Sequence, residues 1–373
     1  MSVVTPIKMP KWGLSMQEGA IVDWCQAEGA AVAEGDDLVD IETSKITNVF
    51  ESPAAGVLRR IIAQPGETLP VGALIGVLAD ADTPEAAIES FISDFQASYL
   101  PPEVDAAGAE ALRISTVEAG GRTIRVGRAG PETGVPVVLI HGYSGDMTNW
   151  LFNIEALSAL APVIALDMLG HGGSSKDVGD GSLKTLSGAV AAALQSLGVT
   201  EAHMVGHSLG AAVVARLAID HAGLARSITL IAPAGLSTTG ISESFLTGVI
   251  DAQRARDLKP VLQMLLADPD MVTKDMVEDV LKSKRVDGVE EALTILRNRM
   301  VDGADSAALR ADLSGIPSAL VIASKADRIV GAPDESALPD GFKVVWIEGA
   351  GHMPHLEQAS AVNALISDAV KAN

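Results

Sequence analysis

The pentapeptide G-H-S-L-G at residues 206–210 constrains the fold of this chain more than any other feature. An apolar run at residues 202–205 comes directly before it, and an alanine-rich, helix-forming run follows it. A G-x-S-x-G pattern between a strand and a helix is typical of a serine on a tight, strained turn that only small neighbours allow. The free N–H groups at the start of the helix face any negative charge that develops there. The motif therefore predicts an α/β fold in which Ser208 is a catalytic nucleophile.

A serine hydroxyl is a weak nucleophile, so it needs a base, and the base needs an acid that orients it. In folds with this motif the chain order is serine, acid, histidine. The late sequence G-A-G-H-M-P-H-L-E holds His352 and His355, and its G-H-x-x-x-x-E spacing favours His352, with His355 as the alternative. Asp327 directly follows a predicted strand, whereas Asp334 lies further along the loop and Asp167 precedes the serine. We expect the serine, Asp327 and His352 to form a catalytic triad.

Two backbone N–H groups are expected to stabilise the oxyanion that such a triad generates. One belongs to Leu209, directly after the serine, and the other is expected from Tyr143 in the segment H-G-Y-S-G. We expect His141 and His207 to be structural residues that form hydrogen bonds around the site. The loop at residues 167–175 is expected to be scaffold at the same edge of the sheet.

From residue 113 onward, apolar strands alternate with alanine-rich helices, which predicts a mostly parallel sheet. Residues 113–373 resemble the α/β-hydrolase superfamily in the motifs H-G-Y-S-G-D, D-M-L-G-H-G-G-S, G-H-S-L-G and G-H-M-P-H-L-E. The resemblance implies the fold and the triad but leaves the substrate open. Residues 235–312 form a charged, helix-patterned insertion, which we expect to be a helical cap that excludes water and shapes the pocket.

The first eighty residues contain an internal repeat. Three glycines recur 37 residues later, in the pairs Gly19 and Gly56, Gly29 and Gly66, and Gly35 and Gly72. Glycines at repeated positions predict repeated turns with positive φ, joined by short strands. A β-unit that occurs only twice is a duplicated domain rather than a solenoid, and it predicts a small flattened barrel with pseudo-twofold symmetry.

Lys45 lies between two strand-like runs, at residues 38–42 and 48–51. A connection this short predicts the tip of a hairpin, which would hold the lysine out into solvent on a rigid scaffold. A covalent carrier would be attached at such a position, because its arm must reach other active sites.

Residues 1–79 resemble the lipoyl domains of 2-oxoacid dehydrogenase complexes in the segments P-K-W-G-L-S-M-Q-E-G, E-T-S-K and S-P-A-A-G-V-L. Biotinyl domains share the fold, but they usually flank their lysine with methionines, and here Ser44 and Ile46 flank it. The resemblance implies an all-β lipoyl domain with lipoate on Lys45. Biotin, or an unmodified lysine, remains the alternative.

Residues 80–112 predict a linker that contains one amphipathic helix. Thr83 and Pro84 provide a cap and a first turn, and apolar residues then follow at helical spacing until Pro101 and Pro102. The segment has no lysine or arginine. Two interpretations stay open, namely a helix packed on a neighbouring element and a docking helix for a partner subunit.

Composition excludes several functions. The chain has 27 Lys+Arg against 48 Asp+Glu, a net charge of −21, which argues against nucleic acid and against anionic membranes. No apolar run is long enough to span a bilayer, no signal peptide is evident, and no metal site is predicted. The one cysteine, Cys25, falls in a predicted strand and is expected to be buried. We expect a cytoplasmic protein.

The two halves together suggest acyl transfer, since a lipoyl arm carries acyl thioesters and a serine triad transfers acyl groups. The simplest hypothesis is that Ser208 takes the acyl group and that coenzyme A then accepts it. The whole layout resembles the acyltransferase (E2) subunit of acetoin dehydrogenase complexes. That resemblance implies an acetyl group and two partners, a thiamine-diphosphate-dependent acetoin dehydrogenase (E1) and dihydrolipoamide dehydrogenase (E3). We also expect a homo-oligomer.

Two other functions stay open, namely a lipoyl-tethered thioesterase that uses water as acceptor and a lipoyl carrier whose second domain is only a scaffold. Coenzyme A is polyanionic, yet residues 235–312 have 10 Lys+Arg against 14 Asp+Glu. Two sets of basic residues could still cluster locally, Arg254, Arg256 and Lys259 or Lys282, Lys284 and Arg285.

Overall fold

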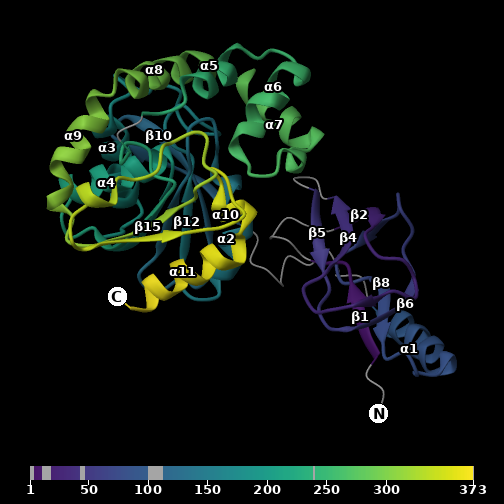
Figure 1. Cartoon of the computed structure of the whole chain (residues 1–373). Helices are drawn as coiled ribbons and strands as arrows, with labels where there is room; N and C mark the ends of the chain where they lie inside the picture. Colours follow the sequence, from purple (N-terminus) through teal and green to yellow (C-terminus); the bar gives the residue numbers. More distant parts are fainter. Residues whose placement is uncertain (1–3, 11–17, 43–46, 100–111, 238–239, 373) are drawn as a thin grey trace. The chain divides into compact units, whose positions relative to one another are not determined.

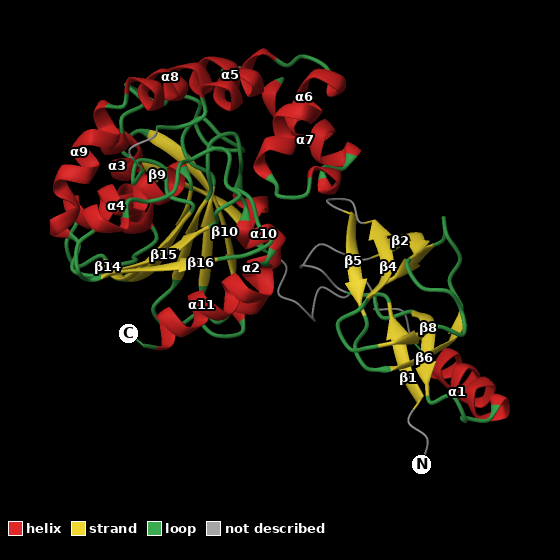
Figure 2. Cartoon of the chain, in the orientation of Figure 1, coloured by secondary structure: helices red, strands yellow, loops and turns green. Residues whose placement is uncertain are grey.

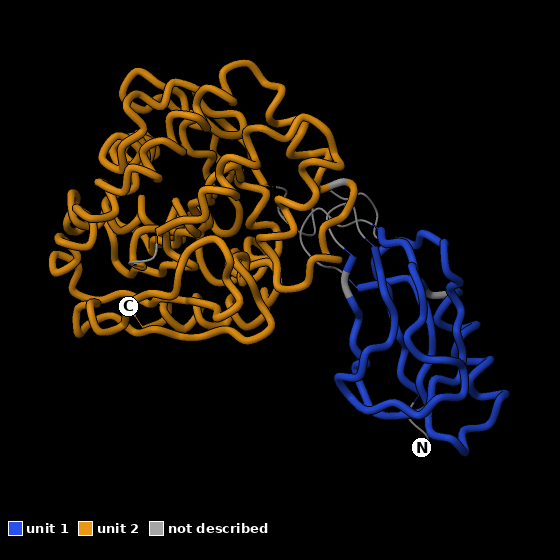
Figure 3. The backbone as a smooth tube through the Cα atoms, turned by 45° about the horizontal axis from the view of Figure 1, so that its top comes forward, with its two compact units in different colours: residues 1–108 blue, residues 109–373 orange. Residues whose placement is uncertain are grey.

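The computed structural model describes residues 4–10, 18–42, 47–99, 112–237 and 240–372. The chain divides into two compact units, residues 1–108 and residues 109–373 (Figure 3). Each unit has its own hydrophobic core. Lys45 lies outside the described residues.

The described strands of the first unit form two four-stranded sheets (Figure 1). They are β1 (Val4–Lys8), β2 (Glu18–Trp24), β3 (Ala31–Val32), β4 (Asp37–Glu42), β5 (Thr47–Glu51), β6 (Gly56–Ile61), β7 (Thr68–Pro70) and β8 (Leu74–Ala79). One sheet has the order β1-β8-β6-β3 and the other β5-β4-β2-β7. In the duplicated halves, β1 corresponds to β5, β2 to β6, β3 to β7 and β4 to β8. Exchanging the strands of each pair turns one order into the other. The predicted duplicated β-domain with pseudo-twofold symmetry is therefore confirmed.

The repeated glycines play two different structural roles. Gly29 and Gly66 have φ of 92° and 88°, as predicted, and Gly35 and Gly72 have φ of 88° and 82°. The prediction of positive φ is wrong for Gly19 and Gly56, because these two glycines lie in strands β2 and β6. An extended backbone does not require glycine, so spacing alone could not separate this pair from the turn glycines.

Helix α1 (Glu85–Ser98) packs against β8 of the first unit. Ile88 is fully buried with Leu74 and Val77, and partly buried aromatic residues of the helix extend this cluster. The carboxylate of Glu85 receives Arg59 and Arg60 from β6, which ties the start of the helix to the sheet. The helix from the 80–112 segment thus belongs to the packed body of the first unit.

Two local predictions in this unit are wrong. Thr83 does not cap α1, because Pro84 occupies the cap position and the Thr83 hydroxyl is buried without a partner among the described residues. Cys25 lies one residue beyond the end of β2 and its side chain is exposed. Partial desolvation and the neighbouring Asp40 raise the pKa of the Cys25 thiol, which disfavours the reactive thiolate.

The second unit is built on one eight-stranded sheet of the order β16-β15-β14-β13-β11-β12-β10-β9 (Figure 2). Its strands are β9 (Arg113–Ala119), β10 (Arg122–Ala129), β11 (Val137–Ile140), β12 (Val163–Leu166), β13 (Ala202–His207), β14 (Ala225–Ile231), β15 (Ala319–Ala323) and β16 (Phe342–Trp346). Among the described strands of this sheet, only the pairings of β10 with β9 and β12 are antiparallel. The predicted mostly parallel sheet is confirmed.

Helices cover both faces of this sheet. Helices α3 (Leu183–Ser196) and α4 (Leu209–Asp220) pack together on one face, and α2 (Leu151–Ser158) and α11 (Ala359–Lys371) pack together on the other (Figure 2). The central strands are buried along their whole length, as expected for a parallel sheet with two covered faces. In the described part of the chain, no helix is long and apolar enough to cross a membrane.

The insertion between β14 and β15 is helical, as predicted. It contains α5 (Glu243–Asp251), α6 (Ala255–Leu262), α7 (Lys274–Lys284), α8 (Val289–Asp302) and α9 (Ala304–Asp312). Side chains of α5 and α8 join the main hydrophobic core of the unit. The helices α6 and α7 share a smaller core that also includes Met353. The insertion is therefore a packed cap, which closes over the carboxyl ends of the central strands.

Candidate active site

Ser208 lies on the sharp turn that joins β13 to α4. Its φ of 53° is in the left-handed region, which is unusual for a residue other than glycine. A Cβ at Gly206 would collide with the backbone of Gly210, and a Cβ at Gly210 would collide with the backbone of Ile140. Glycine is therefore required on both sides of the serine, which is the reason for the G-x-S-x-G spacing.

His352 and Asp327 lie on neighbouring loops, after β16 and β15. The Nδ1 atom of His352 is 2.8 Å from Oδ2 of Asp327, and both side chains are almost fully buried. The other carboxylate oxygen of Asp327 accepts the backbone N–H groups of Ile329 and Val330, at 2.8 and 3.1 Å. Asp327 is thus fixed by its own loop, and its contact with Nδ1 leaves Nε2 of His352 available to act as a base.

Glu357 gives a physical role to the last position of the G-H-x-x-x-x-E spacing. Its carboxylate accepts the N–H of Gly351 at 2.7 Å and the N–H of Ala267, in the cap, at 2.6 Å. Burial raises the pKa of this carboxyl, and the backbone N–H groups oppose that rise. The glutamate therefore joins the loop of His352 to the cap.

The rejected candidates for base and acid have other surroundings. His355 is fully buried between the rings of Trp150 and His207, at centroid distances of 4.6 and 4.4 Å. Neither of its ring nitrogens has a partner among the described residues, and burial lowers its pKa to about 3. Asp334 instead accepts hydrogen bonds from Ser336 at a surface turn.

His207, directly before Ser208, supports the base. Its Nε2–H donates to the backbone carbonyl of His352 at 2.8 Å. Burial and the neighbouring imidazoles hold the pKa of His207 well below its usual value, so the ring stays neutral. His207 thereby holds the backbone of His352, the residue that would activate Ser208.

The two expected oxyanion donors lie beside the serine. Within the described residues, neither the N–H of Tyr143 nor that of Leu209 donates a hydrogen bond to the protein. A Cβ at Gly142 would approach Cβ of Ser208 to 3.0 Å, so the preceding loop lies directly against the turn. Both N–H groups are therefore free to face a developing oxyanion.

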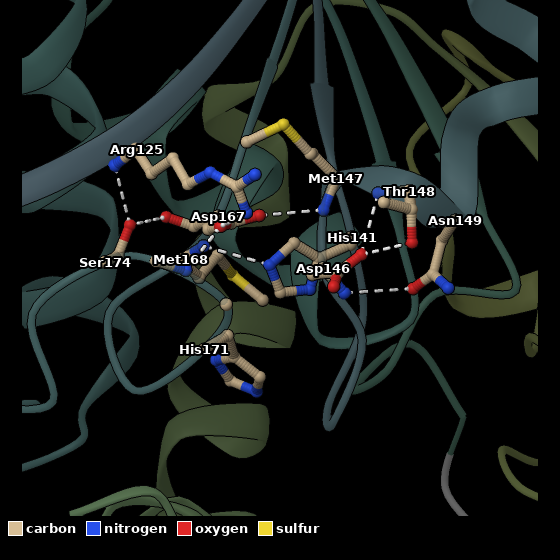
Figure 4. A network of polar contacts seen from close by, with 12 residues as sticks. Arg125, His141, Asp146, Met147, Thr148, Asn149, Asp167, Met168, His171 and Ser174 are labelled. Atoms are coloured by element: carbon tan, nitrogen blue, oxygen red, sulfur yellow. Dashed lines mark hydrogen bonds and ion pairs between the residues drawn. The ribbon is translucent and has the colours of Figure 1, made fainter. Parts of the chain in front are cut away.

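The loop that contains Asp167 is scaffold (Figure 4). The Asp167 carboxylate is fully buried and accepts the N–H groups of Met147 at 2.9 Å and Gly173 at 2.7 Å. Arg125 approaches the same carboxylate at 3.4 Å. Nε2 of His141 accepts the N–H of Met168 at 2.9 Å, which links the two loops.

Some of these supporting residues were not predicted. Arg125, whose guanidinium pairs with the Asp167 carboxylate, comes from β10 and has no local sequence signal. Asp146 and Asn149 form a capping box at the short helix η1 (Met147–Trp150), and the spacing D-x-x-N could have indicated it. The role of His171 was also missed, because the N–H that its Nε2 accepts belongs to Ser144, in another loop.

A cavity of about 100 Å³ opens onto Ser208 and His352. Most of its wall is apolar and comes from the cap and the adjoining loops, namely Ile241, Phe245, Leu246, Leu262, Leu265, Leu266, Met276, Val280, Met300, Ile329, Met353 and Leu356. A small apolar cavity with polar groups gathered at the serine suits a short acyl group.

Three of the six basic residues in the two sets have other partners. Lys284 is buried and donates to the backbone carbonyls of Ile250, at 2.8 Å, and Ala252. Lys282 lies 3.5 Å from Asp279, and Arg256 lies 3.4 Å from Asp257. The cleft of about 400 Å³ beside Lys284 and Arg285 also contains Asp287, Glu290 and Glu291. Acidic residues therefore accompany the second set, and Lys284 is already bound to backbone carbonyls.

Two family models match the chain. Residues 137–365 match the Alpha/beta hydrolase family, and residues 5–78 match the Biotin-requiring enzyme model. Among solved structures, the meta-cleavage product hydrolase CumD from Pseudomonas fluorescens IP01 has a TM-score of 0.63 at 22% identity, over 69% of this chain and 98% of that chain. The 2-hydroxy-6-oxo-6-phenylhexa-2,4-dienoate hydrolase BphD from Rhodococcus sp. strain RHA1 has a TM-score of 0.60 at 21% identity, over 69% and 100%. These likenesses show the fold alone.

Full-length relatives are more informative. The dihydrolipoyllysine-residue acetyltransferase component of the acetoin cleaving system of Pseudomonas putida is 42% identical over 367 residues, which is 97% of each chain. The protein of the same description from Cupriavidus necator is 40% identical over 371 residues, which is 97% of this chain and 96% of that one. Both domains are included in these matches. The chain belongs to the family of dihydrolipoyllysine-residue acetyltransferase components of acetoin cleaving systems.

Proposed function

We propose that this chain transfers an acetyl group from S-acetyl-dihydrolipoyl-lysine at position 45 to coenzyme A, and that Ser208 carries the acetyl group between them. One observation carries the proposal. The 2.8 Å contact of His352 with Asp327 lies at an apolar cavity that also exposes Ser208, in a chain that begins with a lipoyl-type domain.

The first half-reaction would acylate the serine. His352 Nε2 takes the hydroxyl proton of Ser208, and Oγ forms a bond to the acyl carbon of the thioester. The N–H groups of Tyr143 and Leu209 stabilise the oxyanion. As the carbon–sulfur bond breaks, the proton on His352 passes to the departing sulfur, which leaves as a thiol.

The second half-reaction would reverse these roles. His352 takes the proton of the coenzyme A thiol, and that sulfur forms a bond to the acyl carbon on Ser208. The serine oxygen leaves and receives the proton from His352. Asp327 orients the imidazole throughout and stabilises its cationic form. The apolar wall from the cap would keep water from competing with the thiol.

The described strands on both sides of Lys45 fit a lipoyl attachment site. Strands β4 and β5 are antiparallel neighbours, and their pairing continues to Glu42 and Thr47, which directly flank residues 43–46. Lipoate bound there would supply a dithiol on a long arm that carries the acyl group. The lysine supplies the amine for the amide bond.

We further propose that the partners are those of an acetoin dehydrogenase complex, a thiamine-diphosphate-dependent E1 and dihydrolipoamide dehydrogenase as E3, with this chain as a cytoplasmic homo-oligomer. The full-length relatives support these partners, because both are named as components of an acetoin cleaving system.

The decisive experiment uses the full-length lipoylated protein with its dihydrolipoyl group acetylated, incubated with and without coenzyme A. We expect acetyl-coenzyme A as the main product only when coenzyme A is present. The variant Ser208→Ala should lower this rate roughly a thousandfold or more. Chromatography with mass detection separates acetyl-coenzyme A from acetate.

The other two functions predict different products. Free acetate as the main product in both incubations would indicate a lipoyl-tethered thioesterase. An unchanged transfer rate in Ser208→Ala would indicate a lipoyl carrier with a scaffold domain. Either result would contradict the proposed acetyltransferase mechanism.

A further inference from the structure

The loop that would supply one oxyanion donor is held in a strained conformation. Ser144, directly after Tyr143, has a φ of 59°, in the left-handed region. Such a conformation persists only where the surroundings impose it. The N–H of Ser144 donates to Nε2 of His171 at 3.1 Å, and Nδ1–H of His171 donates to the carbonyl of Leu169 at 2.9 Å. The buried histidine therefore fixes one side of the loop.

The cap fixes the other side. The Tyr143 hydroxyl donates to the backbone carbonyl of Leu293, in α8, at 3.1 Å. The tyrosine side chain is buried in the core that the cap shares with the sheet. The same residue thus offers its N–H to the active site and its hydroxyl to a cap helix.

Packing on this side of the loop is incomplete. A cavity of about 10 Å³ lies between Ser144, His171 and Leu293. Because a void gives no close contacts there, the two hydrogen bonds add to the packing of the Tyr143 side chain in holding the loop in position. An oxyanion donor acts only from a fixed place, about 2.7–3.1 Å from the oxygen that becomes charged.

We infer that the Tyr143 hydroxyl is a positioning group, through which helix α8 of the cap holds the oxyanion donor of the active site in place. The cap would then contribute to the rate of serine acylation, in addition to enclosing the acyl group. The inference rests on the proposed role of Ser208, but it requires neither the lipoyl arm nor coenzyme A.

The test is pre-steady-state acylation of the full-length protein by p-nitrophenyl acetate, followed as the burst of p-nitrophenolate. In Tyr143→Phe the loss of one buried hydrogen bond should lower the acylation rate constant by about 2- to 10-fold, with the substrate dissociation constant unchanged. The affinity for 1,1,1-trifluoroacetone, which adds to the serine and places an oxyanion in the hole, should fall by a similar factor. Thermal unfolding checks that the variant is folded.

The chain offers a matched control, since it has two tyrosines. The hydroxyl of Tyr99 also donates to a backbone carbonyl, that of Val71, at 2.9 Å, but it does so in the first unit. Tyr99→Phe removes the same kind of hydrogen bond and should leave both the burst and the inhibitor affinity unchanged.

Three results would overturn the inference. They are an acylation rate in Tyr143→Phe equal to that of the wild type, a weaker substrate affinity without a change in rate, and a burst that survives Ser208→Ala. A normal burst together with no transfer to coenzyme A would contradict only the proposed acceptor, and the comparison of the two tyrosine variants would still decide this inference.

Discussion

Asp327 gives one carboxylate oxygen to its own loop and the other to His352. The loop bonds hold the carboxylate still, so the imidazole bond can select one tautomer and one orientation. His207 restrains His352 from a second side, through a hydrogen bond to its backbone carbonyl. At this scale, the site depends on single hydrogen bonds between residues that are distant in the chain.

Replacing Asp327 by Asn tests the orienting role. The amide keeps the size of the side chain but favours the wrong imidazole tautomer, so we expect kcat to fall by roughly 10²- to 10⁴-fold. The measurement is the rate of acetyl-coenzyme A formation. Asp334→Asn is the matched control, because Asp334 lies in the same inter-strand segment but caps a surface turn. Equal rates in the two variants would contradict the assignment of the acid.

The buried histidines should make the second unit sensitive to acid. The pKa of His355 is about 3 in the folded protein, against an ordinary value of 6.5. The unfolded chain therefore binds a proton that the folded chain excludes. The stability from this residue is fully present above pH 6.5 and decreases by up to about 1.4 kcal/mol per pH unit as the pH falls from there towards 3.

Replacing His355 by Leu should remove this dependence. Between pH 6 and pH 4, the free energy of unfolding of the variant should fall less steeply than that of the wild type. Urea denaturation at several pH values gives the slope. The control is His221→Leu, which replaces an exposed histidine. A wild-type slope in His355→Leu would show that burial of this ring does not govern acid stability.

At the scale of elements, the cap is attached to the catalytic loops and does not only cover them. Its Leu293 accepts from Tyr143, its Leu265 accepts the N–H of His352 at 2.7 Å, and its Ala267 donates to Glu357. The cap therefore contacts both the loop of the proposed oxyanion donor and the loop of the proposed base. We expect changes in the cap to alter acylation as well as substrate selection.

In the first unit, the packing of helix α1 can be tested by substitution. Ile88 is fully buried against β8, so Ile88→Ala should destabilise this unit by about 2–5 kcal/mol. Calorimetry of the full chain should show a lower unfolding temperature for one transition only. Glu89→Ala, at the neighbouring exposed position, is the control. An unchanged transition would show that the helix does not contribute to the core of this unit.

At the scale of the whole molecule, two units with separate cores occupy one chain. We expect residues 1–108 to fold alone, because their sheets and α1 make a complete core. When this fragment is coexpressed with a lipoylating enzyme, its intact mass should increase by one lipoyl group, and Lys45→Arg should abolish the increase. A mass increase of one biotinyl group would contradict the lipoyl assignment. A fragment without a cooperative unfolding transition would contradict the independence of the unit.

The sequence predicted much of this protein because several of its patterns reflect local backbone requirements. The turn at Ser208 admits only glycine at positions 206 and 210, and the turns at Gly29 and Gly66 need positive φ, so these requirements appear directly as letters in the sequence. Strand periods, the order of serine, acid and histidine, and the helical cap are likewise local or sequential signals.

Only the tertiary structure determined which groups meet. The contacts of Tyr143 with Leu293 and of Ser144 with His171 join segments that are distant in the chain. A single sequence carries no local trace of such contacts, because the partner of each side chain is set by which distant segment packs beside it. The sequence by itself thus determined the two folds and predicted the residues of the candidate site. Long-range packing decided how these residues are held.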